Sequence, residues 1–255
     1  MKTAEKKDNI AVGLYTSGSR IIVALEHDGR ISHYKRKMFS QETALFPAVK
    51  RLLPQGKTVR DISEICAAKG PGRFTGIRIA LTVAGTLNVL SGAKIFTATM
   101  FDIFALQAAE SHAFAKSFPG GGRIAVLLHA FREEYFCAFY DAAPGKLPEQ
   151  IIPPAWLPRE ETEKLLSMQK KPFFCIADEE EKPGIYDLLP KKAVPAPKSI
   201  SKVMPEYLIR APRTMGNSDL RPLYLKPAKF ELDAMEKAAK EKAAAENAKK
   251  AEAAK

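Results

Sequence analysis

The most restrictive feature of the sequence is residues 77–91, where apolar side chains occupy nearly every side of a potential helix. At helical spacing one face consists of Ile77, Ala80, Leu81, Ala84 and Leu87, and a second of Ile79, Val83 and Leu90. A remaining stripe of small or flexible groups consists of Arg78, Thr82, Gly85 and Val89. A helix that is apolar all round is buried all round. Either this chain covers both faces or a partner's helices cover one, and the sequence leaves both possibilities open.

The composition is that of a globular chain: 255 residues, 46% of them hydrophobic and 27% charged. This length suits one large domain or two small ones, with a core that needs neither disulfides nor metal. Polar residues interrupt the apolar run of 77–90, which is far short of the ~20 apolar residues of a membrane span. Residues 1–9 carry charges of both signs and no apolar signal core, so we expect a cytoplasmic protein. Three isolated cysteines, Cys66, Cys137 and Cys175, are expected to be buried and reduced.

The net charge of +11 is concentrated in the first half of the chain. Residues 1–130 carry 18 Lys and Arg against 9 Asp and Glu, whereas residues 131–230 carry 16 against 14. The last 25 residues are balanced, with 6 against 6. Such an excess suits a polyanion or an acidic protein partner, and it is equally common as a general property of basic proteomes.

The pattern of apolar runs and turn residues predicts two successive α/β lobes, 1–115 and 116–230, and a tail at 231–255. The first lobe is expected to contain a strand hairpin around Asp28 and Gly29, a helix at 42–53 with Pro47 in its first turn, and a strand at 62–68 before the helix of 77–91. The second should contain strands at 124–129, 135–141 and 173–177, a stretch rich in proline and charge at 143–172, and a helix at 199–211. The Ala-, Lys- and Glu-rich tail is expected to be helical or disordered.

One sharp motif lies at residues 68–78, where Gly70, Gly72 and Gly76 separate the predicted strand from the apolar helix. Amide groups at a helix start can bind an anion, and Thr75 is a candidate cap for this helix. However, no Gly-Lys-Ser/Thr closes a phosphate loop, and the spacing GxGxxxG differs from the dinucleotide pattern GxGxxG. The residues by themselves therefore favour a tight structural turn over a nucleotide cradle.

The stretch KGPGRFTGIRIALTVAGTL, together with the hairpin AVGLYTSGSRIIVALEHDGRI, resembles the TsaB (YeaZ) family, which takes part in the synthesis of threonylcarbamoyladenosine on tRNA. Weaker similarities are ETALFPAVKRLL, HAFREEYFCAFYD and PLYL. The resemblance covers most of residues 10–226 and is strongest at 62–100. The motif loop that carries it consists of Gly70, Pro71, Gly72, Phe74, Thr75, Gly76 and Arg78.

This resemblance implies a two-lobed actin/sugar-kinase/Hsp70-like fold with a reduced second lobe. It also implies a non-catalytic subunit, without cofactor or metal, that pairs with the catalytic subunit TsaD and is joined by the ATPase TsaE. The contacting helices would be those at 42–53 and 75–90. The implied contact residues are Leu45, Val49, Leu52, Ile79, Thr82, Val83, Gly85, Thr86 and Val89. Whether the isolated chain forms a homodimer through these helices, and whether it touches tRNA, is left open.

Two departures from the family pattern bear on catalysis. Tyr15 precedes Thr16 and Ser17 where the family often has Asp-Thr-Ser, and His129 stands where the family motif leads us to expect Asp. A neutral tyrosine cannot replace a carboxylate at a hard-cation site, and the four histidines include no HxxxH pair. The sequence thus lacks the ligands that catalysis on this fold requires.

The alternative function is a small ATP-binding kinase or ATPase of the same fold. It would use Gly70 to Gly76 for phosphates and need Mg²⁺. The nearby acidic candidates are Asp61, Glu64 and Asp102, for which solvated or helix-start roles are the simpler interpretation. A metalloprotease finds less support, because the sequence provides no metal ligands for it, and Ser17, Ser19 and Ser40 have no evident histidine base.

Overall fold

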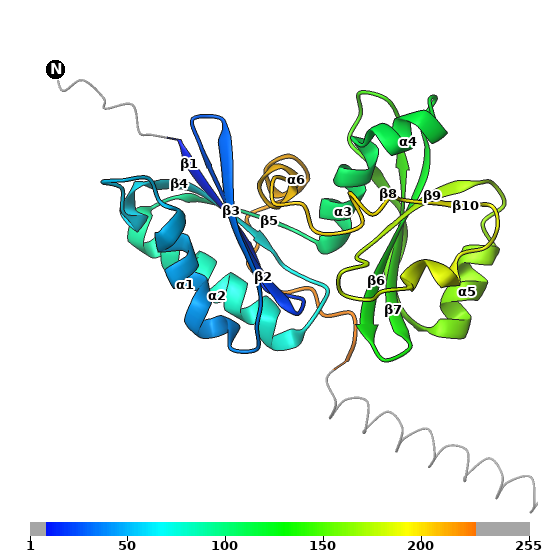
Figure 1. The fold of residues 1–255 in the computed structure, drawn as a ribbon, viewed down its shortest axis with the longest axis horizontal. Coiled ribbons are helices and arrows are strands. Elements are labelled where there is room, and N and C mark those ends of the chain that lie inside the picture. Colours follow the sequence, from blue (N-terminus) through cyan, green and yellow to red (C-terminus); the bar gives the residue numbers. More distant parts are fainter. Residues whose placement is uncertain (1–8, 228–255) are drawn as a thin grey trace, which may run out of the picture. The chain divides into compact units, whose positions relative to one another are not determined.

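The structure, a computed structural model, describes residues 9–227 and contains two five-stranded mixed sheets with helices packed on them (Figure 1). The first sheet has the order β3-β2-β1-β4-β5. Its strands are β1 (Ile10–Tyr15), β2 (Arg20–His27), β3 (Arg30–Lys37), β4 (Ile62–Ala68) and β5 (Lys94–Ala98). The prediction for the tail at 231–255 lies outside the described residues.

The first sheet joins an antiparallel meander to two parallel strands. The turn between β2 and β3 is formed by Asp28 and Gly29, both at positive φ, as the hairpin signal predicts. Strand β4 pairs in parallel with β1, and β5 pairs in parallel with β4, which requires crossover connections. Helices α1 (Gln41–Leu52) and α2 (Phe74–Ser91) make these crossovers, and a 3₁₀ turn, η1 (Val59–Asp61), leads into β4.

The two faces of the first sheet carry side chains of different size. Large apolar residues such as Val12 and Leu14 face α1 and α2 and form the main core of this sheet. On the other face β1 carries the small residues Ala11 and Gly13, and a Cβ on Gly13 would lie 2.9 Å from the Cβ of Leu208. This small face is covered by α6 (Tyr207–Met215), which therefore brings the end of the described chain back onto the first sheet (Figure 1).

The second sheet repeats the plan of the first, with the order β10-β9-β6-β7-β8. Its strands are β6 (Gly122–Phe131), β7 (Glu134–Ala142), β8 (Glu149–Pro158), β9 (Phe173–Ala177) and β10 (Ala193–Pro195). The accompanying helices are α3 (Met100–Ala109), α4 (His112–Ser117), α5 (Arg159–Ser167) and the 3₁₀ helix η2 (Ile185–Leu188). The α/β class is confirmed. Contacts join the chain into one unit up to Leu223, and the lobe boundaries at 115 and 230 stay a prediction.

Several element boundaries differ from those predicted. Helix α2 begins at Phe74 with Arg73 as its N-cap, so Thr75 lies in the first turn and caps nothing. Pro47 lies in the second turn of α1, where its missing N–H removes one helical hydrogen bond on an exposed side of the helix. The helix expected at 199–211 begins only at Tyr207.

The stretch 143–172, for which the sequence shows only a richness in proline and charge, contains β8 and α5. The prolines of β8, at 153, 154 and 158, obscure the strand signal because proline cannot donate to a β-ladder. Strand β8 tolerates them because it lies at the edge of the second sheet and pairs with β7 only.

The cysteine prediction is confirmed, since Cys66, Cys137 and Cys175 are buried and free. Burial raises the pKa of the Cys66 and Cys137 thiols to about 12, which leaves them protonated and unreactive. By length and composition alone, α2 could cross a membrane, a property that core helices of soluble proteins share. Here six residues of α2 are buried within the chain's own fold.

Candidate functional site

Helix α2 buries one face and leaves a ridge exposed. Its buried residues are Gly76, Ile77, Ala80, Leu81, Ala84 and Leu87. The ridge along the opposite side, called the α2 ridge below, consists of Phe74, Arg78, Thr82, Thr86, Val89 and Leu90, all exposed. Val89 is 84% exposed and Phe74 47%. Within residues 9–227, the chain therefore buries one face of α2 and leaves the ridge on the opposite side uncovered.

The predicted partner-contact residues fall into three groups. Leu45 and Val49 are fully buried in the core of the first sheet, so we leave them out of any partner surface. Three residues pack partly against that core: Leu52, Ile79 and Val83. The remaining four lie on or beside the α2 ridge: Thr82, Gly85, Thr86 and Val89. A Cβ on Gly85 would meet only the Cδ1 of Leu220, at 3.8 Å.

The glycine motif packs against the turn that follows β1. A Cβ on Gly76 would lie 2.0 Å from the carbonyl oxygen of Thr16, and one on Gly72 would lie 2.4 Å from that of Ser17. The Thr16 hydroxyl donates to the Gly76 carbonyl at 2.6 Å, and the Arg73 N–H donates to the Ser17 carbonyl at 2.7 Å. The motif glycines thus allow the backbone of the motif to touch the backbone of this turn.

Other motif residues lie around this contact. A Cβ on Gly70 would lie 2.6 Å from the Leu223 carbonyl oxygen, and the peptide bond to Pro71 is cis. Phe74 and Arg78 point outward from α2, with the Arg78 guanidinium 4.5 Å from the centre of the Phe74 ring. These two motif residues therefore belong to the α2 ridge as well.

A cleft of about 800 Å³ opens beside the motif loop, between residues of the first and second sheets. Its floor includes Tyr15, whose pKa burial raises well above the ordinary value, helped by the negative charges of Asp178 and Glu181. Tyr15 is therefore neutral, as the sequence predicts, and supplies no anionic ligand. His129 also lines the cleft, and its ring Nε2 lies 2.9 Å from the carbonyl oxygen of Arg132.

Acidic residues after β9, which the sequence reasoning missed, form the other wall of the cleft. Asp178 is only 6% exposed, and burial, with the charges of Glu181 and Glu180, raises its pKa to about 7. Its carboxylate accepts the backbone N–H groups of Glu180 at 3.1 Å and Glu181 at 3.3 Å. The signal was the acidic run at 178–181 that directly follows an apolar strand.

The acidic candidates named for a kinase have structural partners elsewhere. Asp61 and Asp102 each complete a capping box, with Thr58 and Thr99 respectively, and Asp102 also accepts the Tyr140 hydroxyl at 2.8 Å. Glu64 accepts from the Arg213 guanidinium at 2.8 Å. None of the three lines the cleft. Among residues 9–227, no group of three or more His, Cys, Asp or Glu side chains is placed to hold a metal ion.

Comparisons with known proteins were made for sequence and for structure. The family model described as "TsaD: tRNA N6-adenosine threonylcarbamoyltransferase" matches residues 40–156. A tRNA threonylcarbamoyladenosine biosynthesis protein TsaB from Buchnera aphidicola subsp. Schizaphis graminum (strain Sg) is 28% identical over 102 residues, which are 40% of this chain and 44% of that relative. The TsaB of Buchnera aphidicola subsp. Acyrthosiphon pisum (strain APS) is 22% identical over 68% of this chain and 76% of its own.

The TsaB of Bacillus subtilis (strain 168) is 29% identical over 54% of this chain and 56% of its own. The alignments with the first and third of these relatives thus span about half of the relatives' lengths. The solved structure of YeaZ from Pseudomonas aeruginosa superposes with a TM-score of 0.64 at 23% identity, covering 85% of this chain and 100% of its own. A second Pseudomonas aeruginosa structure, of an uncharacterized protein with similarity to peptidase YEAZ, superposes with a TM-score of 0.61 at 23% identity. It covers 86% of this chain and 100% of its own.

The structural likeness and the repeated sheet order confirm the expected actin/sugar-kinase/Hsp70-like fold. The three sequence relatives all carry the TsaB name, and the match to the TsaD family model includes the glycine motif. The TsaB names of these relatives agree with the resemblance that the motif and the first hairpin predict.

Proposed function

We propose that this chain is a non-catalytic partner subunit of the machinery that makes threonylcarbamoyladenosine on tRNA. The TsaB name of its relatives supports the process, and the match to the TsaD family model supports a TsaD-type subunit as the partner. On this proposal a TsaE-type ATPase joins the pair, and the complex is cytoplasmic. The basic first half of the chain would favour contact with tRNA.

The observation that carries this proposal is the exposed α2 ridge. A long helix that leaves Phe74, Val89 and Leu90 uncovered costs solvation free energy, which a partner helix would recover. Small side chains at Thr82, Gly85 and Thr86 permit close helix approach. A contact of about 800 Å² on each partner is enough for a stable complex. The same ridge would support a homodimer when the partner is missing.

A non-catalytic role also fits the cleft. Asp178, Glu180 and Glu181 line it, and their carboxylates would repel the phosphates of a nucleotide. Tyr15, a neutral side chain, lines the cleft at the sequence position where the family often has aspartate. The alternative, a small ATP-binding kinase, is tested by titrating ATP and Mg²⁺ into the isolated chain; micromolar binding would favour it.

The partner proposal is tested by Thr86→Arg, with Thr214→Arg as a matched control. Both are exposed helical threonines whose hydroxyl donates to the carbonyl four residues earlier, at 2.9 Å and 2.8 Å. Only Thr86 lies on the α2 ridge. An arginine at the centre of a helix contact should cost at least ~2 kcal/mol, or about 30-fold in affinity for a TsaD-type subunit.

Binding is measured by isothermal titration calorimetry, after circular dichroism has shown that both variants are folded. The control should bind as the unmodified chain does. Equal affinity of all three proteins would show that the α2 ridge is not the contact surface. Sedimentation of the isolated proteins in the same experiment reports whether Thr86→Arg also breaks a homodimer.

A further inference from the structure

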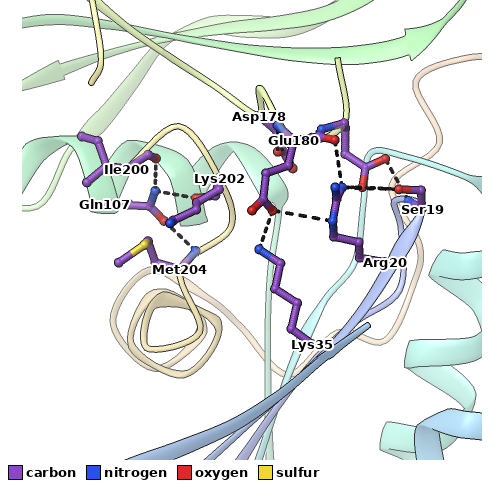
Figure 2. Close-up of polar contacts among 10 residues, drawn as sticks. Ser19, Arg20, Lys35, Gln107, Asp178, Glu180, Ile200, Lys202 and Met204 are labelled. Atoms are coloured by element: carbon purple, nitrogen blue, oxygen red, sulfur yellow. Dashed lines mark hydrogen bonds and ion pairs between the residues drawn. The ribbon is translucent and has the colours of Figure 1, made fainter. Parts of the chain in front are cut away.

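The turn between β1 and β2 gathers hydrogen-bond donors around one carboxylate of the same chain. The Ser19 backbone N–H donates to Glu181 Oε2 at 2.9 Å, and the Ser19 hydroxyl donates to Oε1 at 2.8 Å. The Arg20 guanidinium donates to the same Oε1 at 2.9 Å and to the Glu180 carbonyl at 2.9 Å. Figure 2 shows Ser19 and Arg20 beside Glu180, with the contact between Arg20 and Glu180 as a dashed line.

The site is enclosed but lies beside open space. The side chains of Glu181 and Arg20 are 17% and 20% exposed, and Ser17, Ser19 and Glu181 all line the 800 Å³ cleft. The absence of a side chain at Gly18 makes room for the carboxylate, because a Cβ there would lie 2.9 Å from Glu181 Cδ. A ligand in the cleft would therefore reach the donors at the place where the carboxylate now lies.

Donors of this kind fit a tetrahedral oxyanion. A backbone amide, a hydroxyl and a guanidinium that converge on two oxygens are the groups with which proteins bind phosphate. We propose that Ser19 and Arg20 form an oxyanion-binding site which Glu181 keeps filled, so that the chain closes its own cleft to phosphate-bearing ligands.

The filling carboxylate is held in place from the second sheet. Asp178, at the end of β9, fixes the backbone of Glu180 and Glu181 through its two accepted N–H groups. Lys35 on β3 is paired with the Glu180 side chain. An internal carboxylate positioned in this way has a high effective concentration, which millimolar free phosphate does not match. The unmodified chain is therefore expected to show no specific response to phosphate.

The test is Glu181→Ala, probed with inorganic phosphate by thermal unfolding of the isolated full chain. Sodium chloride at equal ionic strength and pH 7 is the reference. Three donors without a competing carboxylate, with Glu180 still nearby, should bind phosphate with a Kd of about 1 mM. At 10 mM phosphate the folding equilibrium of the variant should then shift about 11-fold beyond the chloride reference.

Two controls separate the site from general salt effects. Glu179→Ala removes a neighbouring carboxylate whose side chain does not line the cleft, and it should respond to phosphate as the unmodified chain does. The double variant Arg20→Ala/Glu181→Ala should lose the gained response, because the charged donor is gone. If Glu181→Ala is unfolded in every salt, Glu181→Gln keeps the side-chain volume and should gain a smaller phosphate-specific shift.

A folded Glu181→Ala or Glu181→Gln whose phosphate response equals that of the unmodified chain would overturn the proposal. So would phosphate binding by the unmodified chain at similar affinity. This inference goes beyond the proposed function and uses a different surface from the α2 ridge. If the phosphate test fails, the proposed partner binding through the α2 ridge still stands. If the partner-binding test fails, the proposed oxyanion site still stands.

Discussion

Replacing Asp178 by asparagine should stabilise the protein, and the gain should grow with pH. The Asp178 carboxyl is almost wholly buried, and its surroundings raise its pKa from 3.8 to about 7, first through desolvation and then through the charges of Glu181 and Glu180. An asparagine side-chain oxygen can accept the same two backbone N–H groups without carrying a charge. The substitution therefore removes the buried charge and keeps the hydrogen bonds.

The direction and size of this pH effect follow from the pKa of Asp178 in the unfolded chain and its pKa in the folded chain. Between pH 3.8 and about 7 the folded state holds a proton that the unfolded chain has released, so the free energy of unfolding falls as pH rises. The stability that the neutral form provides is complete below pH 3.8 and is lost as the pH passes about 7. At about 1.4 kcal/mol per pH unit over roughly three units, the ceiling is ~4 kcal/mol. The Asp178→Asn variant, which has no carboxyl group to ionise at this position, would not lose this amount.

Urea unfolding at pH 4.5, 6 and 8 measures the effect. The difference between Asp178→Asn and the unmodified chain should widen steadily toward pH 8. Asp187→Asn is the control, since it removes a carboxylate that is exposed on η2 and should produce no such widening. A difference that stays constant from pH 4.5 to 8, or a variant less stable at pH 8, would refute the reasoning from a buried ionisable Asp178.

Two further substitutions test packing, with urea unfolding as the measurement. Gly76→Ala should lower the free energy of unfolding by more than ~3 kcal/mol, because the new Cβ would lie 2.0 Å from the Thr16 carbonyl oxygen. Gly85→Ala is its control in the same helix: the new Cβ would meet open space, so the free energy of unfolding should rise by up to ~1 kcal/mol. Gln107→Ala should cost about 2–4 kcal/mol, because it leaves one backbone N–H and two partly buried carbonyls unpaired, whereas exposed Gln150→Ala should cost little. Equal effects within either pair would contradict the assigned contacts.

The sequence predicts the first sheet well because its signals are local. The alternation of apolar residues, the Asp28-Gly29 turn and the strongly apolar helix each fix one element without reference to distant residues. The exposed stripe of α2 could not be assigned in this way. Whether Thr82 or Leu81 faces solvent depends on which side the sheet lies, and only the packing of α2 on β4 decides it.

The second half was predicted less well because its segments depend on contacts far along the chain. Residues 199–206 form turns rather than helix because Gln107 holds them: its side-chain amide donates to the carbonyls of Ile200 at 2.6 Å and Lys202 at 2.8 Å, and its oxygen accepts the Met204 N–H (Figure 2). Gln107 lies more than ninety residues earlier, in an apolar helix where a single glutamine gives no warning of this role.

The turn after β1 joins the two surfaces discussed above. On one side it carries the start of α2, because Arg73 N–H donates to the Ser17 carbonyl and the Thr16 hydroxyl donates to Gly76. On the other side, two residues further along, Ser19 binds Glu181 from the second sheet. The turn between β1 and β2 is thus in contact with the start of α2 on one side and with Glu181 on the other. The first turn of α2 therefore cannot shift unless the turn between β1 and β2 moves with it. The motif glycines are thus needed where the end of the α2 ridge meets the turn that Glu181 holds, and this requirement explains their spacing without any bound phosphate.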